Sequence, residues 1–201
     1  IRELMKRPEA RVASITATGE KKDLGVGQIF LPMAFMGLLL MSVMTGGQLL
    51  LTSTVEEKSS RVMEVLLSAV SPVQLMLGKI VGQMTVSLLM LAMYSGVGVA
   101  GLVAFSFMHI LDPKLLIYMF IFFFISFFTI ASLLAAVGSA VSEMREAQTL
   151  QTPIIFLIMI PWLLVLPISR APNAAYSVAL SFVPIINPFV MMIRLTGSEP
   201  P

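Results

Sequence analysis

The residues best suited to a specific interaction gather in one charged segment, residues 55–79. On a helix, one stripe of this segment is polar and mixes acids with a base, at spacings of four, three and four residues: Glu57, Arg61, Glu64 and Ser68. A second stripe is apolar: Val62, Val65, Leu66 and Ala69. The acid-before-base order of Glu57 and Arg61 stabilises a helix, and Ser71-Pro72 predicts its end, because the residue before a proline disfavours the α conformation. The pattern predicts a short amphipathic helix over about residues 55–69.

A helix of this kind either lies in the lipid interface or docks onto a soluble partner. Its polar stripe carries acids and bases together, whereas a helix bound to an anionic lipid surface should be mainly basic. The mixed stripe therefore favours a groove on a protein partner. An ordinary interfacial loop explains the segment about equally well on physical grounds alone.

Nucleotide hydrolysis by this segment is excluded by its spacing. A phosphate-binding loop has the pattern G-x-x-x-x-G-K-[ST], in which backbone amides and a lysine hold the phosphates. The one Gly-Lys pair is Gly78-Lys79, and Val73 and Ile80 occupy the positions that need glycine and Ser or Thr. Cysteine is absent and His109 is the single histidine, which excludes thiolate and multi-histidine metal sites. We expect no catalytic residues, metal or cofactor in the chain.

The elements that position the charged segment are membrane spans. Hydrophobic residues make up 57% of the 201 residues and charged residues 12%, against about 25% charged in soluble domains. This composition excludes a soluble enzyme and a nucleic-acid-binding module. Since a membrane helix needs about 20 apolar residues, we predict an all-α, polytopic membrane helix bundle with four transmembrane spans: about Val26–Leu51, Ile80–Phe105, Leu115–Ala140 and Pro153–Pro167.

Residues 171–193 are apolar but broken by Pro184, Asn187 and Pro188. Each proline removes a helix donor, and irregular backbone at membrane depth survives only where protein or a cavity surrounds it. We therefore predict a re-entrant hairpin over about residues 174–192 that dips into the outer leaflet.

The centres of the predicted spans contain no charged residue and no histidine, which argues against a secondary transporter. Two sets of three polar residues have their members spaced three residues apart, so that each set lies on roughly one helix face. They are Ser42, Thr45 and Gln48, and Ser126, Thr129 and Ser132. Contacts between helices explain them better than a translocation lining, which stays open as the alternative. Small residues at Gly78, Gly82, Gly96 and Gly98 predict close helix packing.

Three stretches resemble ABC-2-type permeases, the membrane subunits of ATP-binding-cassette exporters such as bacterial sodium-efflux and drug-efflux permeases. The first is Glu56-Glu57-Lys58-x-x-Arg61-x-x-Glu64-x-Leu66-Leu67-Ser68-x-x-Ser71-Pro72, followed by Gly78-Lys79, which resembles the family's first cytoplasmic loop. Gly138 to Pro153 resembles its second cytoplasmic loop, and Ser181 to Phe189, through Arg194, resembles its outer hairpin. The resemblance covers about residues 24–196.

The resemblance implies six spans with an outer domain between the first and second. The four predicted spans would then be the second to fifth, residues 1–23 the edge of the outer domain or a juxtamembrane stalk, and residues 197–201 a polar tail before a last span. Residues 55–69 would face the cytoplasm. A bare count of basic residues favours the opposite orientation, but long translocated domains escape the positive-inside rule.

The resemblance also implies a function. The helix over 55–69 would sit in a groove of a separate ATPase subunit, which binds ATP and Mg²⁺, and the contact would involve Glu56, Glu57, Lys58, Arg61 and Glu64. The chain would be a multi-pass permease of the inner or plasma membrane, and a homodimer or pseudo-dimer would enclose an export path. An intramembrane enzyme or a channel-like oligomer is the alternative. Sodium ions, drugs, lipids and peptides are all compatible substrates of a path without charges.

Overall fold

The computed structural model describes residues 13–15, 21–23, 26–59, 70–104 and 112–197. Two short antiparallel strands precede the helices: β1 (Ala13–Ile15) and β2 (Lys21–Asp23). The helices are α1 (Val26–Ser59), α3 (Pro72–Ala104), α4 (Pro113–Ala140), α5 (Met144–Leu163), α6 (Val165–Arg170), α7 (Ala175–Leu180) and α8 (Asn187–Thr196). Four of the helical stretches are long and apolar enough to cross a membrane: Phe30–Lys58, Pro72–Ala104, Pro113–Ala140 and Met144–Arg170. The predicted all-α bundle of four spans is confirmed.

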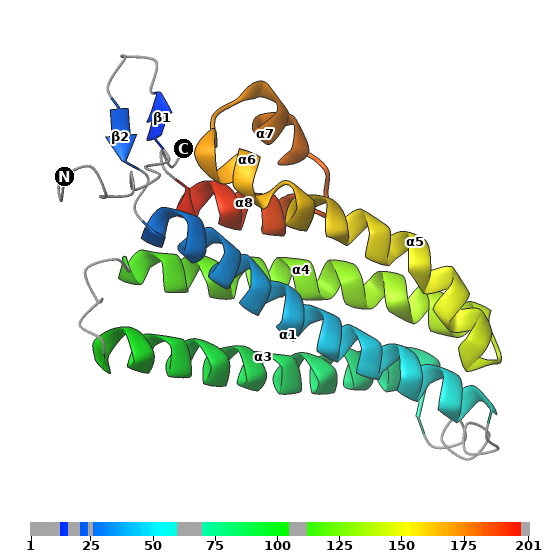
Figure 1. Cartoon of the computed structure of the whole chain (residues 1–201). Helices are drawn as coiled ribbons and strands as arrows, with labels where there is room; N and C mark the ends of the chain where they lie inside the picture. Colours follow the sequence, from blue (N-terminus) through cyan, green and yellow to red (C-terminus); the bar gives the residue numbers. More distant parts are fainter. Residues whose placement is uncertain (1–12, 16–20, 24–25, 60–69, 105–111, 198–201) are drawn as a thin grey trace, which may run out of the picture.

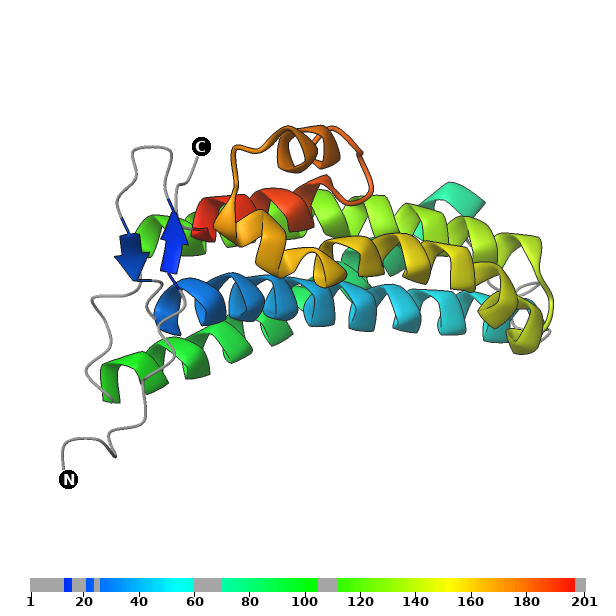
Figure 2. The ribbon, with the colours of Figure 1, turned by 45° about the horizontal axis from the view of Figure 1, so that its top comes forward.

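Helix α1 is the centre of the bundle. It packs against α3, α4, α5, α6 and α8, and it crosses α4 between α3 and α5 (Figure 1). At one end of the bundle, α1 ends near the start of α3, and α4 ends near the start of α5; we name this the loop end. At the other end, which we name the hairpin end, α6, α7 and α8 fold over the first turns of α1 and α4 (Figure 2).

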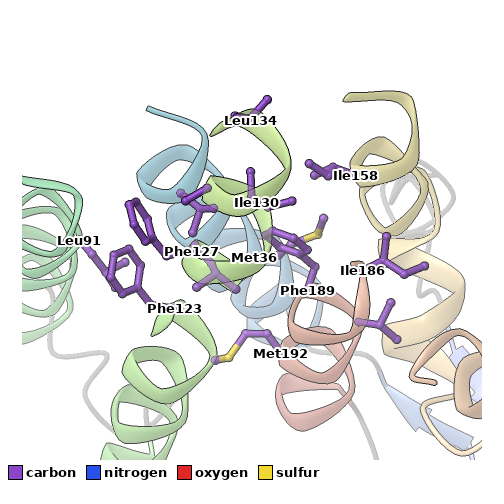
Figure 3. Close-up of a cluster of buried hydrophobic side chains, with 14 of the residues drawn as sticks. Met36, Leu91, Phe123, Phe127, Ile130, Leu134, Ile158, Ile186, Phe189 and Met192 are labelled. Carbon is purple, nitrogen blue, oxygen red and sulfur yellow. The ribbon is translucent and has the colours of Figure 1, made fainter. Parts of the chain in front are cut away.

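The core joins α1 and α4 to α3 on one side and to α8 on the other. Phe123 and Phe127 of α4 stack at 5.7 Å between ring centroids, and Leu91 of α3 lies beside them (Figure 3). Phe189 and Met192 of α8 are fully buried on the other side. Lipid tails are as apolar as these side chains, so burial from lipid adds little. Close packing between helices therefore has to hold the bundle together.

The closest packing occurs at glycines of α1. A Cβ atom on Gly46 would lie 1.8 Å from Ser87 Oγ of α3 and 2.8 Å from Phe127 Cε2 of α4. A Cβ atom on Gly47 would lie 2.7 Å from Leu134 Cδ1. The close packing predicted at Gly78, Gly82, Gly96 and Gly98 is wrong for contacts within this chain, since an added Cβ at each would meet nothing within 4 Å among the described residues. All four are therefore open positions on α3 among the described residues.

Several helix ends differ from the predicted boundaries. Helix α1 continues to Ser59, so residues 55–59 of the predicted amphipathic helix belong to the span, and residues 60–69 lie outside the described residues. Polar residues do not end α1, because the hydroxyl groups of Ser53 and Thr54 both donate to the Leu50 carbonyl of their own helix.

Helix α3 begins at Pro72 rather than near Ile80, because Ser71 and Gln74 form a capping box. Gln74 N donates to Ser71 Oγ at 3.3 Å, and Ser71 N donates back to Gln74 Oε1 at 3.1 Å. Proline is well suited to the first helical position. Ser71-Pro72, predicted to end the preceding helix, is thus the start of a span.

The last two spans differ from prediction by unequal amounts. Helix α4 matches the predicted span within two residues at its start. The fourth span begins at Met144 rather than near Pro153 and runs through α6 to Arg170. Pro153 and Pro161 lie inside α5, as membrane helices tolerate when neighbours satisfy the freed carbonyl groups.

We predict that Gly46→Ala lowers the stability of the bundle, because a methyl group there would force α1 away from both α3 and α4. Overpacking of this kind costs about 1–3 kcal/mol. The measurement is thermal unfolding of the purified protein in one detergent. Gly82→Ala is the matched control and should unfold like the unsubstituted protein, since its Cβ meets open space. Equal unfolding temperatures for the two variants would contradict the proposed packing.

Candidate functional site

The loop end carries an ion pair between two spans. Lys79 Nζ of α3 lies 2.5 Å from Glu57 Oε2 of α1. The Lys79 side chain is 14% exposed and the Glu57 side chain 30% exposed. Exposed ion pairs contribute little to stability, but limited contact with solvent strengthens the attraction. This pair fixes the end of α1 to the start of α3.

Lys58, the next residue, makes a different connection. Its ammonium group donates to Ser139 O at 2.7 Å and to Val141 O at 3.0 Å, at the C-terminus of α4. The last carbonyl groups of a helix lack partners within the helix, and a cation there also interacts favourably with the helix dipole. Lys58 therefore acts as a side-chain cap supplied by α1 to α4.

The predicted ATPase-contact residues have separate locations. Glu56 is exposed at the loop end, whereas Glu57 and Lys58 interact with α3 and α4. Arg61 and Glu64 lie outside the described residues. Sequence reasoning placed Lys79 within the family motif but missed its pairing with Glu57, because the two residues belong to different helices.

A cavity of about 390 Å³ opens beside the ion pair, between the end of α1 and the first turns of α3. Its lining consists of the charged pair, one amide side chain, two apolar side chains and a glycine. These residues are Glu57, Lys79, Gln74, Val70, Leu75 and Gly78. The loop end thus presents a concave surface next to the ends of the segment over 60–69.

The six residues considered for a translocation lining do not form one exposed surface. Ser42 and Ser126 are fully buried, whereas Thr45 and Ser132 are exposed. The five hydroxyl groups each donate to a carbonyl of their own helix, with Leu38, Met41, Phe122, Ile125 and Phe128 as main acceptors. The two triplets therefore make no hydroxyl bonds across helices in the part of the chain that is described.

Gln48 does cross between helices. Its Oε1 accepts a hydrogen bond of 2.6 Å from Gln151 Nε2 of α5, and Gln151 is 4% exposed. Hydrogen bonds between helices in membranes contribute about 0.6–2 kcal/mol. Sequence reasoning missed Gln151, because it assigned Gly138 to Pro153 to a loop.

At the hairpin end, the chain reverses between α7 and α8, over residues 181–186 (Figures 1 and 2). Pro184 is exposed within this reversal, and Pro188 is buried in the first turn of α8. Asn187 Nδ2 donates to the Ser181 carbonyl. The residues that interrupt the apolar pattern therefore gather at the turn.

Arg194 holds the hairpin together. Although charged, it is 8% exposed, and its guanidinium donates to four acceptors, one of which is Met191 Sδ at 3.4 Å in its own helix. Nε donates to Pro172 O at 2.7 Å, Nη1 to Ser181 Oγ at 2.9 Å, and Nη2 to Asn173 Oδ1 at 3.5 Å. The planar guanidinium group suits several acceptors at once. Arg194 thereby satisfies carbonyl and side-chain groups of a backbone that is not helical.

The amino-acid sequence also matches a family of known proteins. Residues 3–200 match the family described as ABC-2 family transporter protein. The chain belongs to the ABC-2 transporter family. As a member with four membrane-spanning helices, it is a multi-pass membrane protein and a membrane component of an ABC transporter.

Two relatives are similar along most of the chain. An uncharacterized protein, MJ1024, of Methanocaldococcus jannaschii is 30% identical over 190 residues, which cover 94% of this chain and 46% of that protein. An uncharacterized protein, YhaP, of Bacillus subtilis is 30% identical over 190 residues, which cover 88% of this chain and 45% of that protein. The chain thus spans about half the length of these curated relatives. No solved structure gives a significant match to the chain.

We predict that Arg194→Lys loosens the hairpin of this ABC-2 protein while it keeps the positive charge. A compact ammonium group cannot reach the acceptors on Pro172, Asn173 and Ser181 together. Losing hydrogen bonds to a charged group should speed amide hydrogen exchange in α7 and α8 by about tenfold or more. Arg170→Lys is the control, since Arg170 is exposed. Unchanged exchange in Arg194→Lys would contradict the role of the guanidinium.

Proposed function

We propose that this chain is the permease part of an ATP-driven ABC-2-type exporter, and that its loop end couples to a separate ATPase subunit that binds ATP and Mg²⁺. The observation that carries the proposal is the construction of the loop end. Two spans run continuously into it, and Glu57, Lys58 and Lys79 join three helices there. A displacement applied to this end would be transmitted directly to the spans.

The lengths of α1 and α3 support this role. Helix α1 has 34 residues and α3 has 33. At 1.5 Å per residue, each is about 50 Å long, whereas the hydrocarbon core is about 30 Å thick. Both helices therefore extend beyond the hydrocarbon, and no flexible joint separates their loop-end turns from the spans in the described residues.

The export path is proposed to lie between two copies or two homologous halves. One side of α1, between α3 and α5, is left uncovered by the described residues (Figure 1). Met41 is 64% exposed and Leu49 43% exposed on that side, and Thr45 lies between them in the sequence and is exposed. A second subunit facing this side would enclose a path that is mainly apolar. An intramembrane enzyme or a channel-like oligomer is the alternative function.

The first test is capture of the ATPase. We predict that the tagged full-length protein, purified from native membranes in mild detergent, brings down an ABC ATPase subunit. Arg61→Glu and Glu64→Lys should each reduce the amount captured by about tenfold, because reversed charges oppose a complementary groove. Lys114→Glu, a charge reversal at the start of α4 at the opposite end of the bundle, is the matched control.

The control variant should capture as much ATPase as the unsubstituted protein. Absence of any ATPase from the unsubstituted preparation would contradict the proposed function. Equal loss in Lys114→Glu and the loop variants would contradict the assignment of the contact to residues 60–69.

The second test concerns orientation. We predict that Ala171→Cys and Ser198→Cys, which flank the hairpin, react with a membrane-impermeant maleimide from the outer side. Ser139→Cys, at the loop end, should react only after the inner side is exposed. The 201-residue sequence contains no cysteine, so each variant adds one reactive site to it. Labelling of positions 171 and 198 from opposite sides would contradict the re-entrant hairpin.

A further inference from the structure

We infer that Glu57 and Lys58 are positioning residues that tie the loop-end termini of α1, α3 and α4 into one unit, and do not serve as contacts to the ATPase subunit. This inference rests on the proposed function, which gives the loop end its role. It reassigns two of the five residues that the family resemblance places at the ATPase contact. The ATPase contact is left to the exposed side of the loop end and to residues 60–69.

The first argument is direction. Consecutive residues of a helix point about 100° apart, at 3.6 residues per turn. Glu57 therefore points toward Lys79 of α3, whereas Lys58 points toward the last turn of α4. Two adjacent side chains thereby hold two helices that lie on different sides of α1. A shift of α1 along its axis has to carry both neighbours with it.

The second argument is availability. Glu57 and Lys79 are less than one third exposed, and their charged atoms are in contact at 2.5 Å. A partner that bound either group would have to break this pair and leave the other charge in a poorly solvated place. Glu56, one position earlier, is instead exposed.

The third argument concerns Lys58. Its side chain is exposed overall, yet its ammonium group donates two of its three possible hydrogen bonds to Ser139 O and Val141 O. Helix α5 begins shortly after, at Met144. The bond to Val141 O therefore holds the short connection between α4 and α5, and it links α1 indirectly to the fourth span.

A charge exchange separates an internal tie from a contact with the ATPase. In the full-length protein, Glu57→Lys and Lys79→Glu alone should each lower the unfolding temperature in detergent. They should also reduce ATP hydrolysis by the copurified complex, relative to the isolated ATPase, by about threefold or more. The double variant with both substitutions should recover most of both losses, because the pair is restored with its charges exchanged.

The matched control moves the Glu→Lys substitution by one residue, from position 57 to position 56. Glu56→Lys combined with Lys79→Glu changes the same charges, but Glu56 is not the residue paired with Lys79 in the structure. This combination should recover neither the unfolding temperature nor the hydrolysis ratio. Recovery in both double variants, or in neither, would overturn the tie between Glu57 and Lys79.

Lys58 is tested by Lys58→Met and Lys58→Arg. Methionine keeps the length of the side chain but cannot donate to the two carbonyl groups, so the hydrolysis ratio should fall while the amount of captured ATPase stays within about twofold. Arginine still donates and should recover most of the ratio. A loss of capture in Lys58→Met that matches the loss in hydrolysis would overturn the inference and restore a contact role.

The outcomes distinguish this inference from the proposed function. The unfolding temperatures of the charge-exchange variants report the tie without any ATPase. If the unsubstituted protein captures no ATPase, the proposed function fails, and the charge exchange still decides whether the tie exists. If capture succeeds but the exchange recovers nothing, the proposed function stands and the tie is wrong.

Discussion

The bundle depends on how closely α1 approaches its neighbours at Gly46. In lipid, burial of apolar side chains contributes little to helix association, so van der Waals attraction between closely packed helices has to supply the stability. Without a side chain, Gly46 lets Ser87 of α3 and Phe127 of α4 come close to the backbone of α1. Ser87 Oγ is buried there without a conventional hydrogen-bond partner, in a position that suits a weak bond from a Cα–H group. The other spans, α5 and α8, then pack on this α1–α4 unit.

Polar groups are treated differently along the bundle. In the middle of α1 and α4, hydroxyl groups donate to carbonyl groups of their own helices. The amide pair of Gln48 and Gln151 connects α1 to α5. At the two ends, long cationic side chains donate to backbone carbonyl groups outside the regular helical hydrogen bonding, as Lys58 does for α4 and Arg194 for Pro172. Both arrangements follow from the same constraint, since carbonyl groups without water need a donor from the protein. The ends are therefore where sequence changes would alter the relation between helices most directly.

The existence of the spans could be predicted from the sequence, because an apolar run long enough to cross a membrane has few other stable structures. Their ends could not. The start of α3 depends on reciprocal bonds between Ser71 and Gln74, and the polar end of α1 is satisfied by its own backbone, neither of which changes hydropathy. Contacts such as Glu57 with Lys79 depend on the angle at which two helices meet. Gly46 and Gly78 look alike in sequence, and only the packing distinguishes a crossing point from an open face.

The buried guanidinium of Arg194 has a consequence for biogenesis. Moving an arginine to the centre of a bilayer costs roughly 3 kcal/mol even during translocon-assisted insertion, and more if its acceptors are missing. Its acceptors lie on Pro172 and Ser181, which the ribosome synthesises earlier. On the proposed placement, folding of α6, α7 and α8 together lowers the cost of bringing this charge into the outer leaflet, because the acceptors are then already in place.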